Sequence, residues 1–398
     1  MPVDFGIVDM DTHYYEPDDA WTRYLEPGME ATALHVERDE DGTACPYFGA
    51  DPIYRLPMLP RDRIQRPGAF VADKDGRFLA VLDEEEDYVV PGDIPWYVRR
   101  EARLEWMDQK GIEAAVLWPS LGLVVERQMR SDPAACQANL RAFNRWLDEE
   151  WGFDHQDRLF AAPWLSLCDR DAAVAELDHV LARGARVVAL LAGPVTGRSP
   201  ADPYFDPFWA RLAEARVPAA FHAGDFGYNE IFGTQWGERP WRASWEQSPL
   251  QQAIFSGERP VVDTLAALVL HNLFGRFPTL EVLTVENGSA WVPYLLRVMD
   301  KGARMGARGE WLGGRLDDVP SDVFKHHVTV APLDDDDIRG LVDTIGVQRV
   351  VLGSDYPHPE GLVEPVQFLE GIGLDREELM LVGRDNGARL LQLPQQRT

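Results

Sequence analysis

Short apolar segments recur along the chain and alternate with longer amphipathic stretches. The apolar segments predict eight buried strands, at residues 5–13, 112–118, 159–165, 185–191, 217–222, 280–286, 327–330 and 349–355. Helical periodicity between them predicts helices at residues 133–150, 171–183, 205–215, 260–274, 291–303 and 337–345. Strands that alternate with helices pair in parallel, because parallel neighbours need a crossover connection. Eight such units predict the α/β class and a closed (β/α)8 TIM barrel. An open doubly wound sheet is the alternative, but no GxGxxG motif follows any predicted strand.

A long segment interrupts this repeat after the first strand. Residues 14–98 are rich in Pro, Gly, Asp and aromatic residues and contain no comparable strand–helix unit. Loops of this length are usually functional. We therefore expect one domain over residues 1–398, with residues 14–98 as a lid or an oligomer contact on the catalytic face of the barrel.

The net charge of −27 bears on the partners of the protein. Nucleic acids and anionic membranes bind clustered positive charge, so neither is expected as a partner. Cys45, Cys136 and Cys168 follow no CxxC spacing, which favours a reducing compartment over a disulfide framework. We find neither a signal peptide nor an apolar run long enough to cross a bilayer. These features predict a cytoplasmic protein that acts on a small molecule.

Acidic and histidine residues stand at the ends of several predicted strands. Asp11 and His13 are two residues apart, so their side chains point to the same side of one strand. His222 and Asp355 end two other strands. Such a set predicts a divalent metal site for zinc, manganese or iron, and its carboxylates favour manganese or iron. Asp9 is expected to bind backbone at the end of the first strand.

Longer motifs then resemble a known family. They include Asp9-Met-Asp-Thr-His-Tyr-Tyr-Glu-Pro17, Phe221-His-Ala-Gly-Asp225 and Gly353-Ser-Asp-Tyr-Pro-His358, in family order across nearly the whole chain. The chain resembles the amidohydrolase superfamily, and within it the amidohydrolase-2 branch, which includes aminocarboxymuconate-semialdehyde decarboxylase and γ-resorcylate decarboxylase. The resemblance implies a barrel with a divalent metal at its C-terminal mouth. Relatives are often dimers, so we also expect a homodimer.

The resemblance also implies roles for particular residues. It maps the metal ligands to Asp11, His13, His222 and Asp355, and it makes Asp355 a general base as well. Some relatives have a carbamylated Lys after strand four, but residues 190–194 contain no Lys, which argues against a carbamate-bridged centre. The decarboxylases also have a sixth-strand His that is absent here, so Glu286 or His271 would take over its proton transfer.

These features leave three functional hypotheses. The leading one is a metal-dependent hydrolase or non-oxidative decarboxylase of a small carboxylate or aromatic substrate. In it Asp355, Glu286 and His271 are catalytic, while His358 and Trp164 contact the substrate. The second is a dinuclear non-haem iron or manganese–iron oxygenase, in which Glu16, Glu286 and His271 hold a second ion. Glu16 could instead anchor a turn or the lid. The third is a non-catalytic subunit that keeps the fold.

Overall fold

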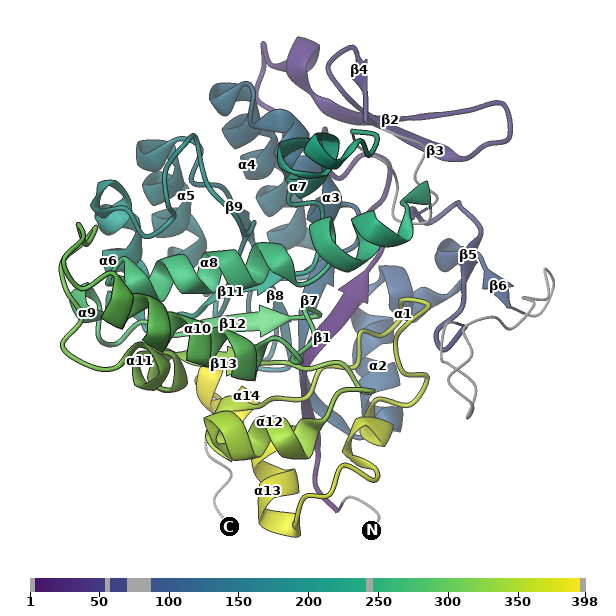
Figure 1. Cartoon of the computed structure of the whole chain (residues 1–398). Coiled ribbons are helices and arrows are strands. Elements are labelled where there is room, and N and C mark those ends of the chain that lie inside the picture. Colours follow the sequence, from purple (N-terminus) through teal and green to yellow (C-terminus); the bar gives the residue numbers. More distant parts are fainter. Residues whose placement is uncertain (1–3, 54–57, 70–86, 241–245, 394–398) are drawn as a thin grey trace.

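The protein is a (β/α)8 barrel, as its sequence predicts (Figure 1). Its computed structural model describes residues 4–53, 58–69, 87–240 and 246–393. Seven of the eight predicted strands are present, most of them shorter than predicted, and the eighth is an extended segment with an isolated bridge. In chain order they are β1 (Ile7–Tyr14), β7 (Ile112–Pro119), β8 with β9 (Leu159–Ala161 and Trp164–Leu165), β10 (Val188–Leu190), β11 (Ala219–His222), β12 (Val282–Val285), β13 (Val328–Val330) and the extended segment 350–354.

Parallel pairing runs around the whole barrel. One sheet has the order β1–β7–β8 and the other β13–β12–β11–β10–β9, with β8 leading directly into β9. The segment 350–354 closes the ring, because Val350 bridges to Val330 of β13 and Tyr356 bridges to Thr12 of β1. Backbone hydrogen bonds from Met10 N to Leu352 O and from Asp355 N to Asp11 O complete this seam.

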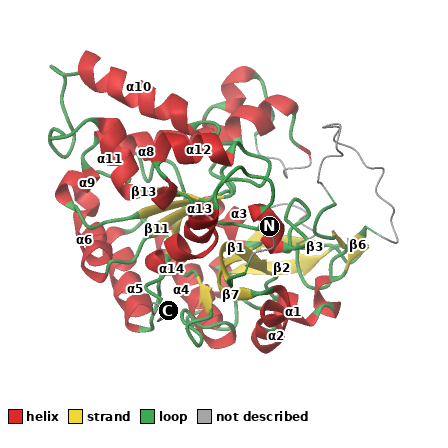
Figure 2. Cartoon of the chain, turned by 90° about the horizontal axis from the view of Figure 1, so that it is seen from below, coloured by secondary structure: helices red, strands yellow, loops and turns green. Residues whose placement is uncertain are grey.

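Helices cover the outside of the barrel (Figure 2). The predicted helices are confirmed, and their ends shift by a few residues at most. In the described part of the chain, the α-helices of five or more residues are α2 (Arg100–Lys110), α3 (Gly122–Met129), α4 (Pro133–Glu150), α5 (Arg170–Ala182), α6 (Asp206–Ala215), α8 (Arg259–Leu270), α10 (Val292–Met305), α11 (Pro320–His327), α12 (Ile338–Ile345), α13 (Arg376–Met380) and α14 (Asn386–Leu390). Shorter helical turns are α1 (Pro95–Val98), α7 (Tyr228–Ile231) and α9 (Leu273–Arg276).

The insertion after β1 contains two small antiparallel sheets. The first consists of β2 (Leu34–Arg38), β3 (Ala44–Phe48) and β4 (Asp51–Pro52), and the second of β5 (Ile64–Gln65) and β6 (Tyr88–Val89). Asn139 of α4 accepts a hydrogen bond from the backbone N–H of Leu34, which fixes the first sheet to the barrel. Residues 54–57 and 70–86 of the predicted lid lie outside the described residues. The lid function therefore stays a prediction.

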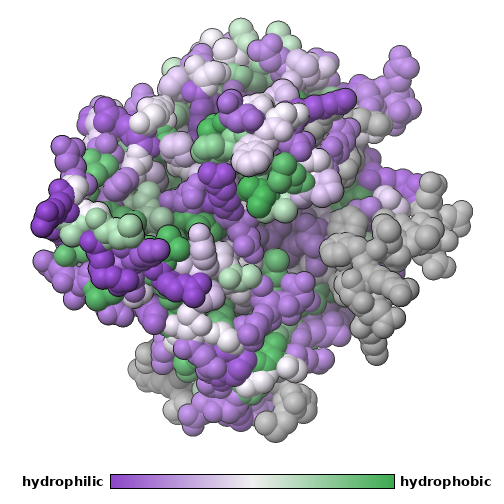
Figure 3. Space-filling model, in the orientation of Figure 1, coloured by the Kyte–Doolittle hydropathy of each residue, from purple (hydrophilic) through white to green (hydrophobic). Residues whose placement is uncertain are grey.

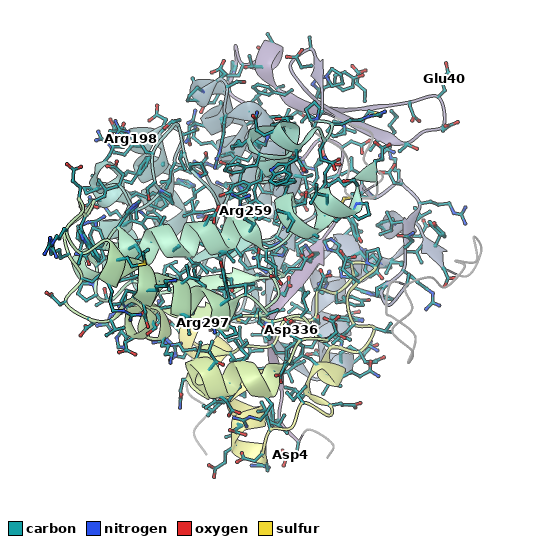
Figure 4. All side chains as sticks on the ribbon, viewed as in Figure 1. Asp4, Glu40, Arg198, Arg259, Arg297 and Asp336 are labelled. Atoms are coloured by element: carbon teal, nitrogen blue, oxygen red, sulfur yellow. The ribbon has the colours of Figure 1, made fainter. Side chains whose placement is uncertain are left out.

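The surface is mainly hydrophilic on the face seen in Figure 3, with small apolar areas between charged ones. Charged side chains such as Asp4, Glu40 and Arg198 project from the outline of the molecule (Figure 4). Among the described residues, no helix is both long and apolar enough to cross a membrane. The predicted homodimer stays a prediction.

One buried amide links the barrel to its outer helices. Asn144 of α4 accepts a hydrogen bond from the backbone N–H of Trp164 and donates one to the carbonyl of the same residue, each over 3.0 Å. It also donates to the carboxylate of Glu176 on α5. The side chain thus takes the place of a strand neighbour for β9, whose backbone groups have no access to water.

We predict that Asn144→Ala lowers the free energy of unfolding by about 2–4 kcal/mol, because a buried N–H and a buried C=O each lose their partner. Urea denaturation followed by tryptophan fluorescence measures the change. Gln348→Ala, on the surface, is the control and should stay within about 0.5 kcal/mol of the wild type. A loss below about 1 kcal/mol for Asn144→Ala would contradict the structural role given to this amide.

Candidate metal centre

Four side chains from three barrel strands converge at the C-terminal end of the barrel. Asp11 and His13 come from β1, His222 ends β11, and Glu286 follows β12. One ligand atom of each lies within 4.8 Å of those of the other three. The Nε2 atom of His222 is 3.3 Å from Asp11 Oδ1 and 3.4 Å from Glu286 Oε2. The Nε2 atom of His13 is 3.3 Å from the same Asp11 oxygen.

A second set of four overlaps the first. It contains His13, Glu286, Asp355 and His358, whose ligand atoms also lie within 4.8 Å of one another. Asp355 Oδ1 is 3.2 Å from His13 Nε2 and 3.0 Å from His358 Nδ1. The rings of His13 and His358 stack with their centroids 3.7 Å apart. The two sets therefore form one continuous cluster, in which His13 and Glu286 are shared.

The backbone of β1 is irregular where it presents Asp11. Asp9 pairs with Ala115 and Thr12 with Leu117, so β1 has one residue more than β7 over this stretch. Such a β-bulge re-aims side chains and is frequent beside active sites. The neighbouring segment approaches closely at Gly353, where a Cβ atom would lie 2.8 Å from the Cβ of Asp11. Only glycine leaves Asp11 its present position.

Two residues of the cluster have a left-handed backbone. The φ angles are 56° for Glu286 and 55° for Asp355, the residues that follow β12 and the segment 350–354. A residue other than glycine pays roughly 1 kcal/mol or more for this conformation. The turn directs each carboxylate toward the barrel axis immediately after its strand ends. Two of the eight non-glycine residues with a positive φ in the described part of the chain thus carry carboxylates of the cluster.

Backbone carbonyls set the orientation of both central imidazoles. Nδ1 of His13 lies 3.2 Å from the carbonyl of Pro119, and Nδ1 of His222 lies 2.9 Å from that of Ala223. A carbonyl oxygen only accepts, so each Nδ1 carries a proton and donates it. In the neutral ring the lone pair is then on Nε2, which points into the cluster. Metal-bound histidines have this outer contact.

The cluster concentrates more negative charge than its imidazoles neutralise. Burial alone would raise the pKa of Asp11, but contacts with His13 and His222 hold it well below its ordinary value. Burial lowers the pKa of His13, yet Asp11 and Asp355 outweigh it and raise that pKa to about 9. Burial, together with the charges of Asp355 and Asp11, raises the pKa of Glu286 well above its ordinary value. Protons thus compensate here for charge that a cation could balance.

A divalent cation fits these residues. His13 Nε2 and both carboxylate oxygens of Asp355 are buried, and apart from ion-pair contacts within the cluster they make no hydrogen bond with any described residue. Buried polar atoms nearly always have a partner, so atoms left without one in such a group point to an ion. Two imidazole nitrogens and several carboxylates are ligands that suit zinc, manganese and iron.

His358 connects the cluster to the end of β7. Its Nε2 lies 3.0 Å from the hydroxyl of Ser120, which donates to the carbonyl of Tyr14 over 2.9 Å. Because that hydroxyl proton is already used, Ser120 accepts from His358 and the ring proton is on Nε2. Burial and the nearby His13 lower the pKa of His358 well below its ordinary value, so the ring is neutral. Its Nδ1 lone pair then faces Asp355.

Two residues predicted for a second metal lie elsewhere. Glu16 accepts hydrogen bonds from the backbone N–H groups of Ser120, Leu121 and Gly122, so its carboxylate anchors the loop after β7. His271 follows the last residue of α8, and its Nδ1 contacts the hydroxyl of Ser199. This helix runs back toward the end of the barrel where β12 begins (Figure 1). Neither Glu16 nor His271 belongs to the cluster, so the structure lends no support to the predicted metal or catalytic role of either residue.

Other residues differ from their predicted positions. Trp164 is fully buried and donates its indole N–H to Glu126 of α3, so it packs structurally and does not join the cluster. Trp118 is nearer, with its ring centroid 5.3 Å from that of His222.

Ser120 had not been predicted as part of the site. Its position just after the second predicted strand was the only available signal. Asp9 binds backbone as expected, since it accepts from the N–H groups of Asp11 and Ser354.

Solved structures resemble this fold over most of its length. An amidohydrolase from Mycobacterium avium subsp. paratuberculosis K-10 is 35% identical, with a TM-score of 0.88 over 98% of this chain and 100% of the other. A dihydroxybenzoic acid decarboxylase from Polaromonas sp. JS666, crystallised with manganese and 2-nitroresorcinol, is 15% identical, with a TM-score of 0.60 over 98% and 97% of the two chains.

A third similarity covers a smaller part of the chain. The 5-carboxyvanillate decarboxylase LigW from Sphingomonas paucimobilis is 17% identical, with a TM-score of 0.58 over 73% of this chain and 82% of the other. No curated protein matches the sequence significantly. The Amidohydro_2 family, described as amidohydrolase, matches residues 8–393. This match spans the barrel strands and the whole cluster, and the protein therefore belongs to the amidohydrolase family.

Proposed function

We propose that this protein is a metal-dependent enzyme that removes the carboxyl group of a small aromatic acid as CO2, without a redox step. The observation that carries the proposal is the environment of Asp355. Its carboxyl group lies beside the set Asp11, His13, His222 and Glu286, and both of its oxygens are buried with no hydrogen bond to any described residue outside the cluster. Non-oxidative decarboxylation needs such an acid next to the point where the substrate carboxylate binds.

The positions of protons and lone pairs around Asp355 support its role as an acid. The oxygen Oδ1 and the Nδ1 lone pair of neutral His358 are 3.0 Å apart. Two lone pairs at this distance repel each other unless a proton or a cation lies between them. Burial raises the pKa of Asp355 to about 6, which favours the protonated form more than in an exposed Asp. His358 therefore positions the carboxyl group and can share its proton.

The positions of the cluster residues indicate which of them would bind the ion and which would donate the proton. Asp11, His13, His222 and Glu286 would hold the ion, and Asp355 could join them. When bound, a divalent cation supplies Lewis-acid polarisation of the substrate oxygens. Asp355 gives its proton to the ring carbon as the bond to the carboxyl carbon breaks and CO2 leaves. The names of the Polaromonas and Sphingomonas proteins indicate aromatic carboxylates as the first substrates to test.

Hydrolysis is the second candidate, and the same residue favours it. With a pKa of about 6, Asp355 is largely ionised at neutral pH and could accept a proton from water that attacks an ester or amide. The two candidates use the same cluster and differ in the direction of proton transfer. They are distinguished by the product and by the fate of solvent hydrogen.

The oxygenase hypothesis has lost most of its support. Of the three residues predicted for a second ion, only Glu286 lies in the cluster. The two overlapping sets share His13, whose Nδ1 is occupied by Pro119, so only its Nε2 can bind an ion. One imidazole nitrogen cannot complete both sets at once. This favours a single ion. The family and the intact cluster likewise support an enzyme over a non-catalytic subunit.

We predict about one divalent ion per chain in protein purified without added metal, measured by mass spectrometry of the dissolved metals. His222→Ala should reduce this content at least tenfold, because it removes an imidazole aimed at the cluster. His271→Ala is the matched control and should keep the wild-type content, since its ring contacts Ser199. Equal metal contents in the wild type and His222→Ala would refute the metal centre.

We further predict that 5-carboxyvanillate or 2,6-dihydroxybenzoate, incubated in D2O, yields CO2 and a product with one deuterium at the carbon that carried the carboxyl group. His358→Gln should lower kcat by roughly 10²–10⁴-fold at unchanged metal content, because it disturbs a proton-transfer group. His326→Gln, on the exposed end of α11, is the control. Cleavage of esters or amides with no CO2 release from any aromatic acid would favour hydrolysis instead.

A further inference from the structure

Two of the three cysteines meet outside the metal centre. Cys136 lies in the first turn of α4 and is fully buried, whereas Cys168 lies in the loop after β9 and is partly exposed. The two side chains interact, and each thiol shifts the pKa of the other. The sulfur of Cys168 also approaches the carbonyl of Pro133 to 4.0 Å, so it sits against the turn of α4 that carries Cys136. Cys45 is in β3 of the insertion and contacts its neighbour Thr43.

The surroundings of Cys168 stabilise a thiolate. The thiol of Cys136 donates to it, and the amide Nε2 of Gln137 donates to its sulfur over 3.6 Å. The hydroxyl of Ser166 contributes a further hydrogen bond. Burial and the carboxylate of Glu126 oppose these donors, but the donors prevail and lower the pKa of Cys168 to about 7.

Cys136 has the opposite character. The hydrogen bond to Cys168 and its own burial raise the pKa of its thiol well above the ordinary value, although the charge of Arg130 acts against them. The pair thus combines one accessible sulfur that ionises easily and one enclosed sulfur that stays protonated. A reactive thiolate needs donors and solvent access, and of these two cysteines Cys168 has both.

We propose that Cys168 and Cys136 form a reversible oxidation site for hydroperoxides, in which Cys168 attacks and Cys136 resolves. The geometry that supports this is the position of the Cys168 sulfur against Pro133 and Gln137, the residues of α4 on either side of Cys136, with Cys168 partly open to solvent and Cys136 buried. The inference is independent of the reaction at the metal centre. It also fits a reducing compartment, where disulfides are usually transient.

The chemistry needs no further reagent than the peroxide. The Cys168 thiolate attacks one peroxide oxygen, the O–O bond breaks, and the leaving oxygen takes up a proton to become an alcohol or water. Cys168 is now a sulfenic acid. The Cys136 sulfur attacks it, an S–S bond forms, and the hydroxyl leaves with the Cys136 proton as water. In total two thiols and one hydroperoxide give one disulfide, one alcohol or water, and one water.

The test treats the purified full-length protein with a small excess of hydrogen peroxide. Free thiols are then alkylated under denaturing conditions and the mass is measured. We expect one alkylated cysteine, Cys45, and a peptide in which Cys136 and Cys168 are linked with the loss of two hydrogens. Dithiothreitol should restore three alkylated thiols. Cys45→Ser is the control and should form the same link. Three free thiols after treatment would refute the proposal.

Two single variants separate the roles of the thiols. In Cys136→Ser the sulfenic acid of Cys168 has no resolving partner, so a cyclic 1,3-diketone should trap it. In Cys168→Ser, Cys136 should remain a thiol at the same peroxide concentration. Trapping of a sulfenic acid at Cys136, or oxidation of Cys168 to a sulfinic acid in the wild type without any link, would overturn the assignment.

The pH dependence provides an independent readout. The alkylation rate of Cys168 in the folded protein should rise with pH and reach half its maximum near pH 7, because only the thiolate reacts. At pH 7 about half of Cys168 would be ionised, compared with roughly 3% for an ordinary thiol of pKa about 8.5. A midpoint near pH 8.5 would show that the donors around Cys168 do not activate it.

Discussion

The buried excess of carboxylate charge at the seam of the barrel is the constraint on which the site depends. Asp11, Glu286 and Asp355 lie within reach of three imidazoles, and of these carboxylates only Glu286 is partly exposed. Placing carboxylates together in a low-dielectric interior is costly unless an opposite charge compensates them. A divalent ion does so for several at once. The raised pKa values of His13 and Glu286 show how far protons must substitute for that charge.

Carboxylates outside the cluster keep its backbone in place. Asp9 accepts hydrogen bonds from the backbone N–H groups of Asp11 and Ser354, on the two sides of the seam. Glu16 does the same for three successive N–H groups of the loop after β7. Arg103 of α2 adds a buried guanidinium that donates to the carbonyl of His13. Each of these three side chains binds backbone groups, so the side chains of the candidate metal ligands remain free to face a bound ion.

The sequence predicts those parts of the site that depend on local periodicity. Strand alternation places Asp11 and His13 on one side, and parallel strands bring their carboxyl ends to the same rim. The sequence does not predict positions that depend on the direction in which a helix runs or on contacts between segments far apart in the chain. His271 follows a helix that returns the chain to the start of the next strand, so it moves away from the rim. Glu16 lies close to the rim, but its oxygens are taken up by backbone donors, which no residue pattern reveals.

The pattern of residues along the sequence does not predict the contacts between side chains across the seam of the barrel. His358 reaches Ser120 because the loop after the last strand folds over the end of β7, two strands away around the ring. The pairing follows from barrel closure, and closure depends on every strand register before it. The thiols of Cys136 and Cys168 meet for the same reason, since α4 packs beside β9. The order of the strands around the ring thus brings together residues that no local motif marks, and both the His358–Ser120 contact and the cysteine pair follow from it.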